Sequence, residues 1–202
     1  KLIISENSRI YFFSPLHKIK KIKKKFKNLK ISFHKEEDFF EILTSLKNGN
    51  FCIDGQTCSV LNEELIKSKF NIKFKTDPIY NFKAIKNKTE ISNMKEAHIQ
   101  DGIALTKFLF WIKKKKINLT EKDVEKKLEN FRKKSKNYLY PSFSTIAGSG
   151  PNGAIIHYKS TKESNRKLKK NDLLLVDSGG QYKYGTTDVT RTICFSKTSQ
   201  NI

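Results

Sequence analysis

The sequence contains no long hydrophobic run. Its longest apolar stretches are Leu173–Val176 and Phe108–Ile112, far shorter than the ~20 residues of a membrane-spanning helix. Hydrophobic residues make up 37% and charged residues 30% of the 202 positions, a composition typical of soluble proteins with charged faces. We therefore expect both stretches to lie in a core, and we expect no membrane partner.

Cysteine is scarce, and no CxxC pair occurs. The three cysteines are Cys52, Cys58 and Cys194, an odd number that fits a reducing cytoplasm better than a secreted disulfide framework. The sequence begins at Lys1 without an initiator Met, and it shows no signal-peptide pattern. We expect a cytoplasmic protein of which this chain is an internal fragment.

Acidic residues are too few to balance the basic ones. There are 20 Asp and Glu against 41 Lys and Arg, which gives a net charge of +21. The electrostatic field of such a charge attracts nucleic acid or anionic lipid. However, the basic residues are mostly Lys, occur throughout the chain, and are not interleaved with aromatic residues as in nucleic-acid grooves. We expect a Lys-rich surface without a specific nucleic-acid partner; 18–30 and 113–116 are the best places for the weaker, nucleic-acid-binding alternative.

The first 80 residues alternate short β-like runs with helical patterns, as an α/β layer structure does. Regularity breaks at Asp77-Pro78, so we place a domain boundary near residue 80. The expected strands are 10–13, 29–33 and 51–54, and the expected helices are 36–46 and 61–69.

Residues 81–202 change from helical to β-rich patterns. A long amphipathic helix is expected from near Lys88, with Thr89 as its N-cap. A second helix is expected at 120–134, where Thr120 and Asp123 resemble a capping box. The strands expected after Tyr140 are 142–147, 153–158, 172–177 and 189–195.

Two aspartates flank the expected turn between the last two strands. Asp177 and Asp188 lie eleven residues apart, with Gly179-Gly180 expected to turn the chain between them. Two carboxylates aimed at one point repel unless a proton or cation neutralises them. A divalent metal is the simplest solution: oxygen ligands suit Mn²⁺, Mg²⁺ or Ca²⁺ and, with imidazole, Zn²⁺ or Co²⁺. Ordinary turn chemistry, or pairing of Asp188 with Arg191, would explain the same residues structurally.

Longer strings around these aspartates resemble the Xaa-Pro aminopeptidases of the creatinase/prolidase superfamily, peptidase family M24. The resemblance covers roughly residues 80–195 in order, which makes it more specific than any short motif. It implies an α+β fold: 1–80 as the C-terminal portion of a creatinase/prolidase-like N-terminal α/β domain, and 81–202 as the N-terminal half of a pita-bread metallopeptidase domain. The matching strings include 83–86, 90–105, 142–147, 150–158, 163–166, 176–182 and 185–192.

The resemblance also implies roles for individual residues. Asp177 would chelate one metal of a pair, and Asp188 would bridge both. His157, in the string Ile-Ile-His-Tyr, would hydrogen-bond the substrate or the tetrahedral intermediate, whereas a lone His is otherwise better read as a core residue. His98 is expected to be structural. The family completes its site with a further histidine and two glutamates, and no His, Asp or Glu follows Asp188 in this chain.

The resemblance therefore implies a metal-dependent aminopeptidase that releases the N-terminal residue from peptides with proline in second position. Its cofactors would be two divalent ions, Mn²⁺ in the first place, with Zn²⁺ or Co²⁺ as alternatives. We expect the whole protein to be a homodimer and this fragment alone to be inactive. A pita-bread binding module without catalysis is the alternative, and a basic nucleic-acid-binding protein is a weaker one.

Overall fold

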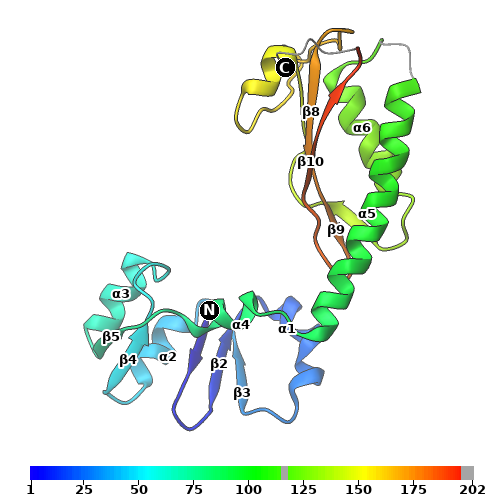
Figure 1. Cartoon of the computed structure of the whole chain (residues 1–202). Helices are drawn as coiled ribbons and strands as arrows, with labels where there is room; N and C mark the ends of the chain where they lie inside the picture. The colour runs from blue at the N-terminus through cyan, green and yellow to red at the C-terminus, as the bar shows by residue number, and fades with distance from the viewer. Residues whose placement is uncertain (115–117, 197–202) are drawn as a thin grey trace. The chain divides into compact units, whose positions relative to one another are not determined.

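A computed structural model describes residues 1–114 and 118–196 of the chain, which forms two compact units, Lys1–Lys83 and Ala84–Ile202 (Figure 1). Each unit has its own hydrophobic core and combines helices with strands, so the expected α+β class is confirmed. None of the helices in the described part of the chain is long and apolar enough to cross a membrane.

The first unit contains two small sheets that share one core. In the three-stranded sheet, of order β1-β2-β3, β1 is antiparallel and β3 parallel to β2, while β4 and β5 form a parallel pair. Side chains from both sheets and from two helices meet in the core, among them Phe13, Leu43, Ile53 and Ile66. The elements are β1 Leu2–Ile4, β2 Ile10–Phe13, α1 Leu16–Ile22, η1 Lys23–Phe26, β3 Ile31–His34, α2 Phe39–Ser45, β4 Asn50–Ile53, α3 Val60–Lys67, β5 Asn71–Phe74 and, running into the second unit, α4 Pro78–Ala84.

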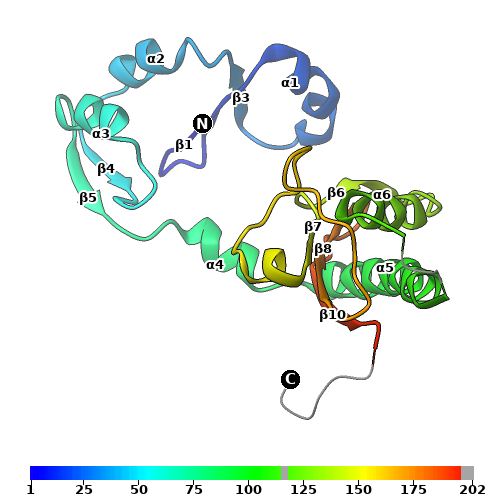
Figure 2. The same cartoon turned by 90° about the horizontal axis from the view of Figure 1, so that it is seen from above.

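The second unit packs two long helices against one face of an antiparallel sheet of order β10-β8-β7. Helices α5 and α6 lie side by side on one side of these strands (Figure 2). A separate pair, β6 and β9, is also antiparallel. The elements are α5 Lys88–Lys114, α6 Glu121–Arg132, β6 Tyr138–Pro141, β7 Ile146–Ser149, η2 Gly150–Ala154, β8 Leu173–Ser178, β9 Gly180–Tyr182 and β10 Val189–Cys194.

Alternation along β8 decides which side chains reach the core. Leu174 and Val176 are buried and belong to the same cluster as Phe108 of α5 and Leu128 of α6. Since successive side chains of a strand point to opposite faces, Asp177 lies on the face away from the helices, where it is only half-buried. One sheet face is therefore covered by the helices. On the other face, η2 packs near Gly148 and Leu175, and the end that carries Asp177 is more open.

Capping determines where both long helices begin. The capping box expected at Thr120 and Asp123 is confirmed, because each side chain bonds the other residue's backbone N–H. Thr89 as the N-cap of the first long helix is wrong. That helix begins at Lys88, and the reciprocal pair is Asn87 and Glu90: the Glu90 N–H donates to Asn87 Oδ1 at 2.9 Å and the Asn87 N–H to Glu90 Oε2 at 2.8 Å.

Two of the strands expected after Tyr140 differ in the structure. The strand expected at 142–147 is confined to Ile146–Ser149. The strand expected at 153–158 is wrong, because this segment is the end of a 3₁₀ helix followed by a turn. Its Ala-Ile-Ile run resembles a strand in apolar content, but Ile155 and Ile156 are exposed and pair with no other strand in the described ranges.

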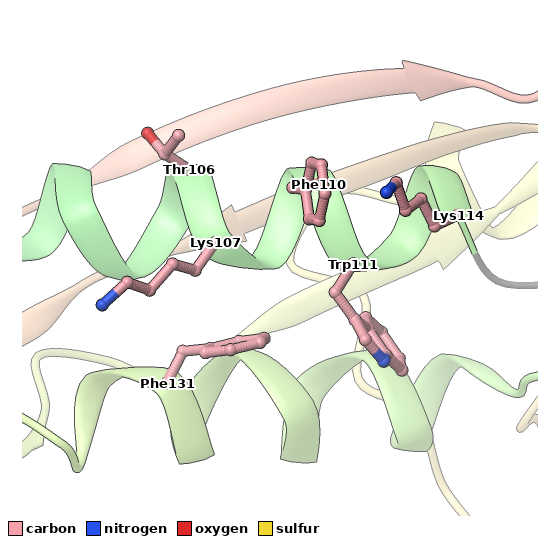
Figure 3. Close-up of a pocket in the computed structure, with 6 residues that line it drawn as sticks. All are labelled: Thr106, Lys107, Phe110, Trp111, Lys114 and Phe131. Atoms are coloured by element: carbon pink, nitrogen blue, oxygen red, sulfur yellow. The ribbon is translucent and has the colours of Figure 1, made fainter.

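An apolar groove of about 590 Å³ runs along the outer surface of α5 and α6 (Figure 3). Phe110, Trp111 and Phe131 line it together with Thr106, Lys107 and Lys114. The Lys114 ammonium lies 4.3 Å from the centre of the Phe110 ring, so cation–π contact covers part of the aromatic surface. No strand contributes to the groove, and neither Asp177 nor Asp188 lines it.

Candidate functional site

The two aspartates belong to adjacent chain segments at one end of the sheet. Strands β8 and β10 are antiparallel, with Asp177 opposite Thr190 and Ser178 opposite Val189. Directly opposed residues share a face, as do residues two apart in one strand. Continuing this alternation one residue beyond the paired segment places Asp188 on the same open face as Asp177.

The two carboxylates differ in their surroundings. Asp177 Oδ1 accepts a hydrogen bond from Thr190 Oγ1 at 2.8 Å, which leaves its second oxygen available. Asp188 is exposed and has no hydrogen bond or ion pair within residues 1–114 and 118–196. The structural alternative, a pair of Asp188 with Arg191, is not seen in these ranges; the Arg191 Nη1 donates to the Thr190 carbonyl at 2.8 Å.

The sequence led us to expect a turn at Gly179-Gly180. In the structure these glycines do not turn the chain. The chain continues through Gly179 into β9 and reverses only beyond it, where the Tyr182 N–H bonds the Gly185 carbonyl at 2.8 Å. Gly179 is required for another reason. A Cβ at this position would overlap the Thr187 carbonyl oxygen and Ser142 Oγ, so only glycine allows the two segments to approach so closely.

A buried ion pair holds the end of β8 against the helices. Arg132, at the last position of α6, is 0% exposed and donates to both carboxylate oxygens of Asp101 on α5, from Nε at 2.6 Å and from Nη2 at 3.1 Å. The same Nη2 donates to Ser178 Oγ at 3.0 Å, and the hydroxyl of Tyr182 donates to Asp101 at 2.9 Å. Ser178, the neighbour of Asp177, is therefore fixed by a guanidinium group.

His157 lies in the turn that follows η2, not on a strand. Its backbone φ is +55°, a left-handed conformation that non-glycine residues seldom adopt. The side chain is exposed, which excludes the reading of His157 as a buried core histidine. Such backbone strain is found preferentially where a side chain must be held in a defined direction.

A buried carboxylate organises the loop that contains His157. Glu121, the first residue of α6, is 0% exposed. Its oxygens accept hydrogen bonds from the backbone N–H groups of Ser149 and Arg166 and from the side chains of Asn152 and Tyr158, at 2.6 to 3.3 Å. The Glu121 oxygens are the acceptors in all of these contacts, so the segment 149–166 is fixed to the start of the helix.

Within the described residues, no three His, Cys, Asp or Glu side chains come together as a metal-binding group. The pairing of β8 with β10 predicts that the two aspartates share one sheet face, and the described residues add no third ligand to them. His98 bonds the Met94 carbonyl four residues earlier on α5, at 2.9 Å, in keeping with its expected structural role. Two carboxylates on one open face are suited to share a divalent cation with ligands from elsewhere.

Sequence reasoning missed three residues that organise this site: Asp101, Glu121 and Arg132. One signal was available for the first. Asp101 falls between Ala97 and Leu105 at a spacing of four, on the apolar face of its helix, where an unpaired charge would be costly. Nothing in the sequence says that its partner is Arg132, 31 positions away.

Comparisons with family models divide the chain into two matches. Residues 92–202 match a model described as metallopeptidase family M24. Residues 1–90 match a model of the creatinase/prolidase N-terminal domain.

Curated relatives match the chain over about 125 residues. Aminopeptidase P2 of Arabidopsis thaliana is 48% identical over 60% of this chain and 18% of its own length. Xaa-Pro aminopeptidase ApepP of Drosophila melanogaster is 44% identical over 61% of this chain and 21% of its own length. The chain thus spans about a fifth of the length of these relatives.

Solved structures match nearly the whole chain. An X-prolyl aminopeptidase from Caenorhabditis elegans, described as a cytosolic enzyme with a di-nuclear active site, is 26% identical with a TM-score of 0.81, over 99% of this chain and 34% of that one. A prolidase from Pyrococcus furiosus has the same fold, with a TM-score of 0.75 at 24% identity over 98% of this chain and 56% of its own.

Buried tyrosines predict a loss of stability at alkaline pH. Burial raises the pKa of the Tyr182 hydroxyl above its usual value of 10.0, and neighbouring Asp101 raises it further. Folding therefore favours the neutral form, so this stabilisation is complete below pH ~10 and is lost as the pH rises beyond it. We expect Tyr182→Phe to make the decline of the unfolding free energy above pH ~10 shallower, by up to about 1.4 kcal/mol per pH unit.

Urea unfolding at a series of pH values measures this slope. Tyr184→Phe is the matched control, because Tyr184 is 53% exposed and should keep the wild-type slope. Equal slopes for Tyr182→Phe and wild type would show that Tyr182 does not carry the effect.

Proposed function

Because the chain belongs to metallopeptidase family M24 and carries a creatinase/prolidase N-terminal domain, we propose that the whole protein is a metal-dependent aminopeptidase. It releases the N-terminal residue from peptides with proline in second position, as the names of its relatives suggest. The proposal is supported chiefly by Asp177, on the face of β8 away from the helices, and by the expectation that Asp188, two residues before Thr190, lies on that same face. We place the domain boundary at 80/81, so that 81–202 form the first half of the pita-bread domain.

The donor set fits part of a site for two divalent ions. Asp177 would hold one ion and Asp188 both, through oxygens that no positively charged group of the described residues occupies. The further histidine and two glutamates implied by the family are not among the residues after Asp188. We propose Mn²⁺, with Zn²⁺ or Co²⁺ as alternatives. When bound, the ions activate a water molecule and polarise the scissile carbonyl group.

His157 is proposed to contact the substrate. Its imidazole is exposed while its backbone is held in a strained turn. The ring is therefore available to a ligand, and the Glu121 network fixes the backbone from which it projects. In that position it would donate a hydrogen bond to the carbonyl oxygen as negative charge develops there. The binding-module alternative assigns no role to an exposed, strained histidine.

We also propose a cytoplasmic location, supported by the three free cysteines and by the cytosolic enzyme from Caenorhabditis elegans. The substrate is a peptide with a penultimate proline. A homodimeric state remains a prediction.

The first test concerns metal and specificity in the whole protein. Chelation should abolish hydrolysis of Xaa-Pro peptides, and added Mn²⁺ should restore it, because the aspartates alone cannot activate water. A matched peptide with alanine in place of proline is the control. Full activity after chelation would contradict the metal proposal, and equal cleavage of both peptides would contradict the specificity.

The second test concerns His157. His157→Ala should lower kcat/KM of the whole protein by ~10²-fold or more with little change in Tm, since loss of one oxyanion donor has effects of this order. His157→Asn is the matched variant, because Asn tolerates the left-handed conformation but lacks the imidazole. If Asn restores activity, backbone geometry and not the imidazole is what matters.

The third test uses the 202-residue chain itself. We expect weak Mn²⁺ binding and no peptidase activity, because two carboxylates cannot offset the repulsion between two cations ~3.5–4 Å apart. Calorimetric titration with Mn²⁺ measures the affinity. Two equivalents bound at micromolar affinity would mean that other ligands, for example from a second copy, complete the site.

A further inference from the structure

We propose that helix α6 positions the two parts of the site separately, through a buried charged residue at each end. Glu121, its first residue, positions the turn that contains His157. Arg132, its last residue, positions the end of β8 that contains Asp177. The inference rests on the proposed function and adds two positioning residues to it.

At the start of α6, the hydrogen bonds of Glu121 tie down the loop that contains His157. Its carboxylate receives the Tyr158 hydroxyl at 2.6 Å, and Tyr158 is the residue directly after His157. The Ser149 and Arg166 amides, which bound the loop on either side, bind the same carboxylate at 2.8 and 3.0 Å. The strained turn is thus tied to the helix just beyond His157 and at both of its ends.

At the second end, the Arg132 guanidinium acts through one hydroxyl group. It donates to Ser178 Oγ at 3.0 Å while its pair with Asp101 fixes its own plane. Ser178 follows Asp177 in β8 and lies opposite Val189, the residue after Asp188. One hydrogen bond therefore acts on the end of the strand pair that carries Asp177, where Asp188 directly precedes β10.

The helix between these ends is well suited to serve as a spacer. It has twelve residues, which corresponds to about 16 Å between its first and last Cα atoms at 1.5 Å per residue. A capping box fixes its start, and Val124 and Leu128 are both 0% exposed in the core. The two networks share no residue among the hydrogen bonds of the described ranges, so each should respond to mutation independently.

The experiment uses two mild variants of the whole protein, one for each network. Tyr158→Phe removes the hydroxyl bonded to Glu121, together with its contacts to Asn152 and Ser164 in the same loop. Ser178→Ala removes the hydroxyl bonded to Arg132. Val124→Ala is the matched control, because it leaves a cavity in the same helix but touches neither network. For each variant we would measure Tm, Mn²⁺ affinity by calorimetry, kcat/KM for an Xaa-Pro peptide, and backbone hydrogen exchange.

We expect the effects to separate. Tyr158→Phe should lower kcat/KM by about 10-fold with unchanged Mn²⁺ affinity. Ser178→Ala should weaken Mn²⁺ binding by about 10-fold. Both values are at the lower end of the effects seen when a residue that orients a metal ligand is mutated. Hydrogen exchange should accelerate in 155–166 for the first variant and in 173–194 for the second. Val124→Ala should lower Tm without a selective change in either segment.

Parallel changes of both measurements in both variants, or no change in either, would overturn the proposal. So would an equal effect of Val124→Ala at the same loss of Tm, because that would indicate general destabilisation. If the wild-type protein fails to cleave Xaa-Pro peptides, the proposed function is wrong. The hydrogen-exchange pattern still decides in that case whether α6 positions the two segments.

Discussion

Burial of charge at both ends of one helix is the constraint on which the second unit depends. Glu121 and Arg132 are each 0% exposed, and an ion taken out of water costs several kcal/mol unless hydrogen bonds and counter-charges replace its hydration. Asp101 supplies a counter-charge to Arg132, whereas the hydrogen bonds that Glu121 accepts within the described residues come from neutral donors. Moving the end of β8 would deprive Arg132 of its contact with Ser178. Moving the loop 149–166 would leave Glu121 without its hydrogen-bond donors.

The same constraint explains why the sheet can leave one face open. Apolar packing on the helix side, through residues such as Val176, holds the strands, and on the other face η2 packs near Gly148 and Leu175. Asp177 and Asp188 can therefore remain without compensating charge in the described structure. Gly179 permits the close approach behind them. The position of the carboxylates therefore depends on backbone contacts and on the buried ion pair, as well as on the hydrogen bond that Asp177 accepts from Thr190.

The sequence predicted those features that are encoded locally. The second long helix is marked by Thr120 and Asp123, whose mutual capping needs only a three-residue spacing, and β8 is marked by a continuous apolar run. The fold class and family followed from strings spread over more than a hundred positions. The strand expected at 153–158 was wrong because an apolar run does not reveal whether it will be paired, and here the hydrogen bonds of Glu121 decide the conformation.

The two aspartates could be found from sequence but their support could not. Asp101 and Arg132 are 31 positions apart and Glu121 and Arg166 are 45 apart, separations at which no spacing rule applies. The directionality of hydrogen bonds and ion pairs still explains why charged residues, and not apolar ones, occupy the two ends of α6. Apolar contacts are non-directional, so a leucine in place of Arg132 could fill the volume but could not select Ser178 over its neighbours. A planar guanidinium bound to a carboxylate in two places has one orientation, and in this orientation its Nη2 donates to Ser178, the residue next to Asp177.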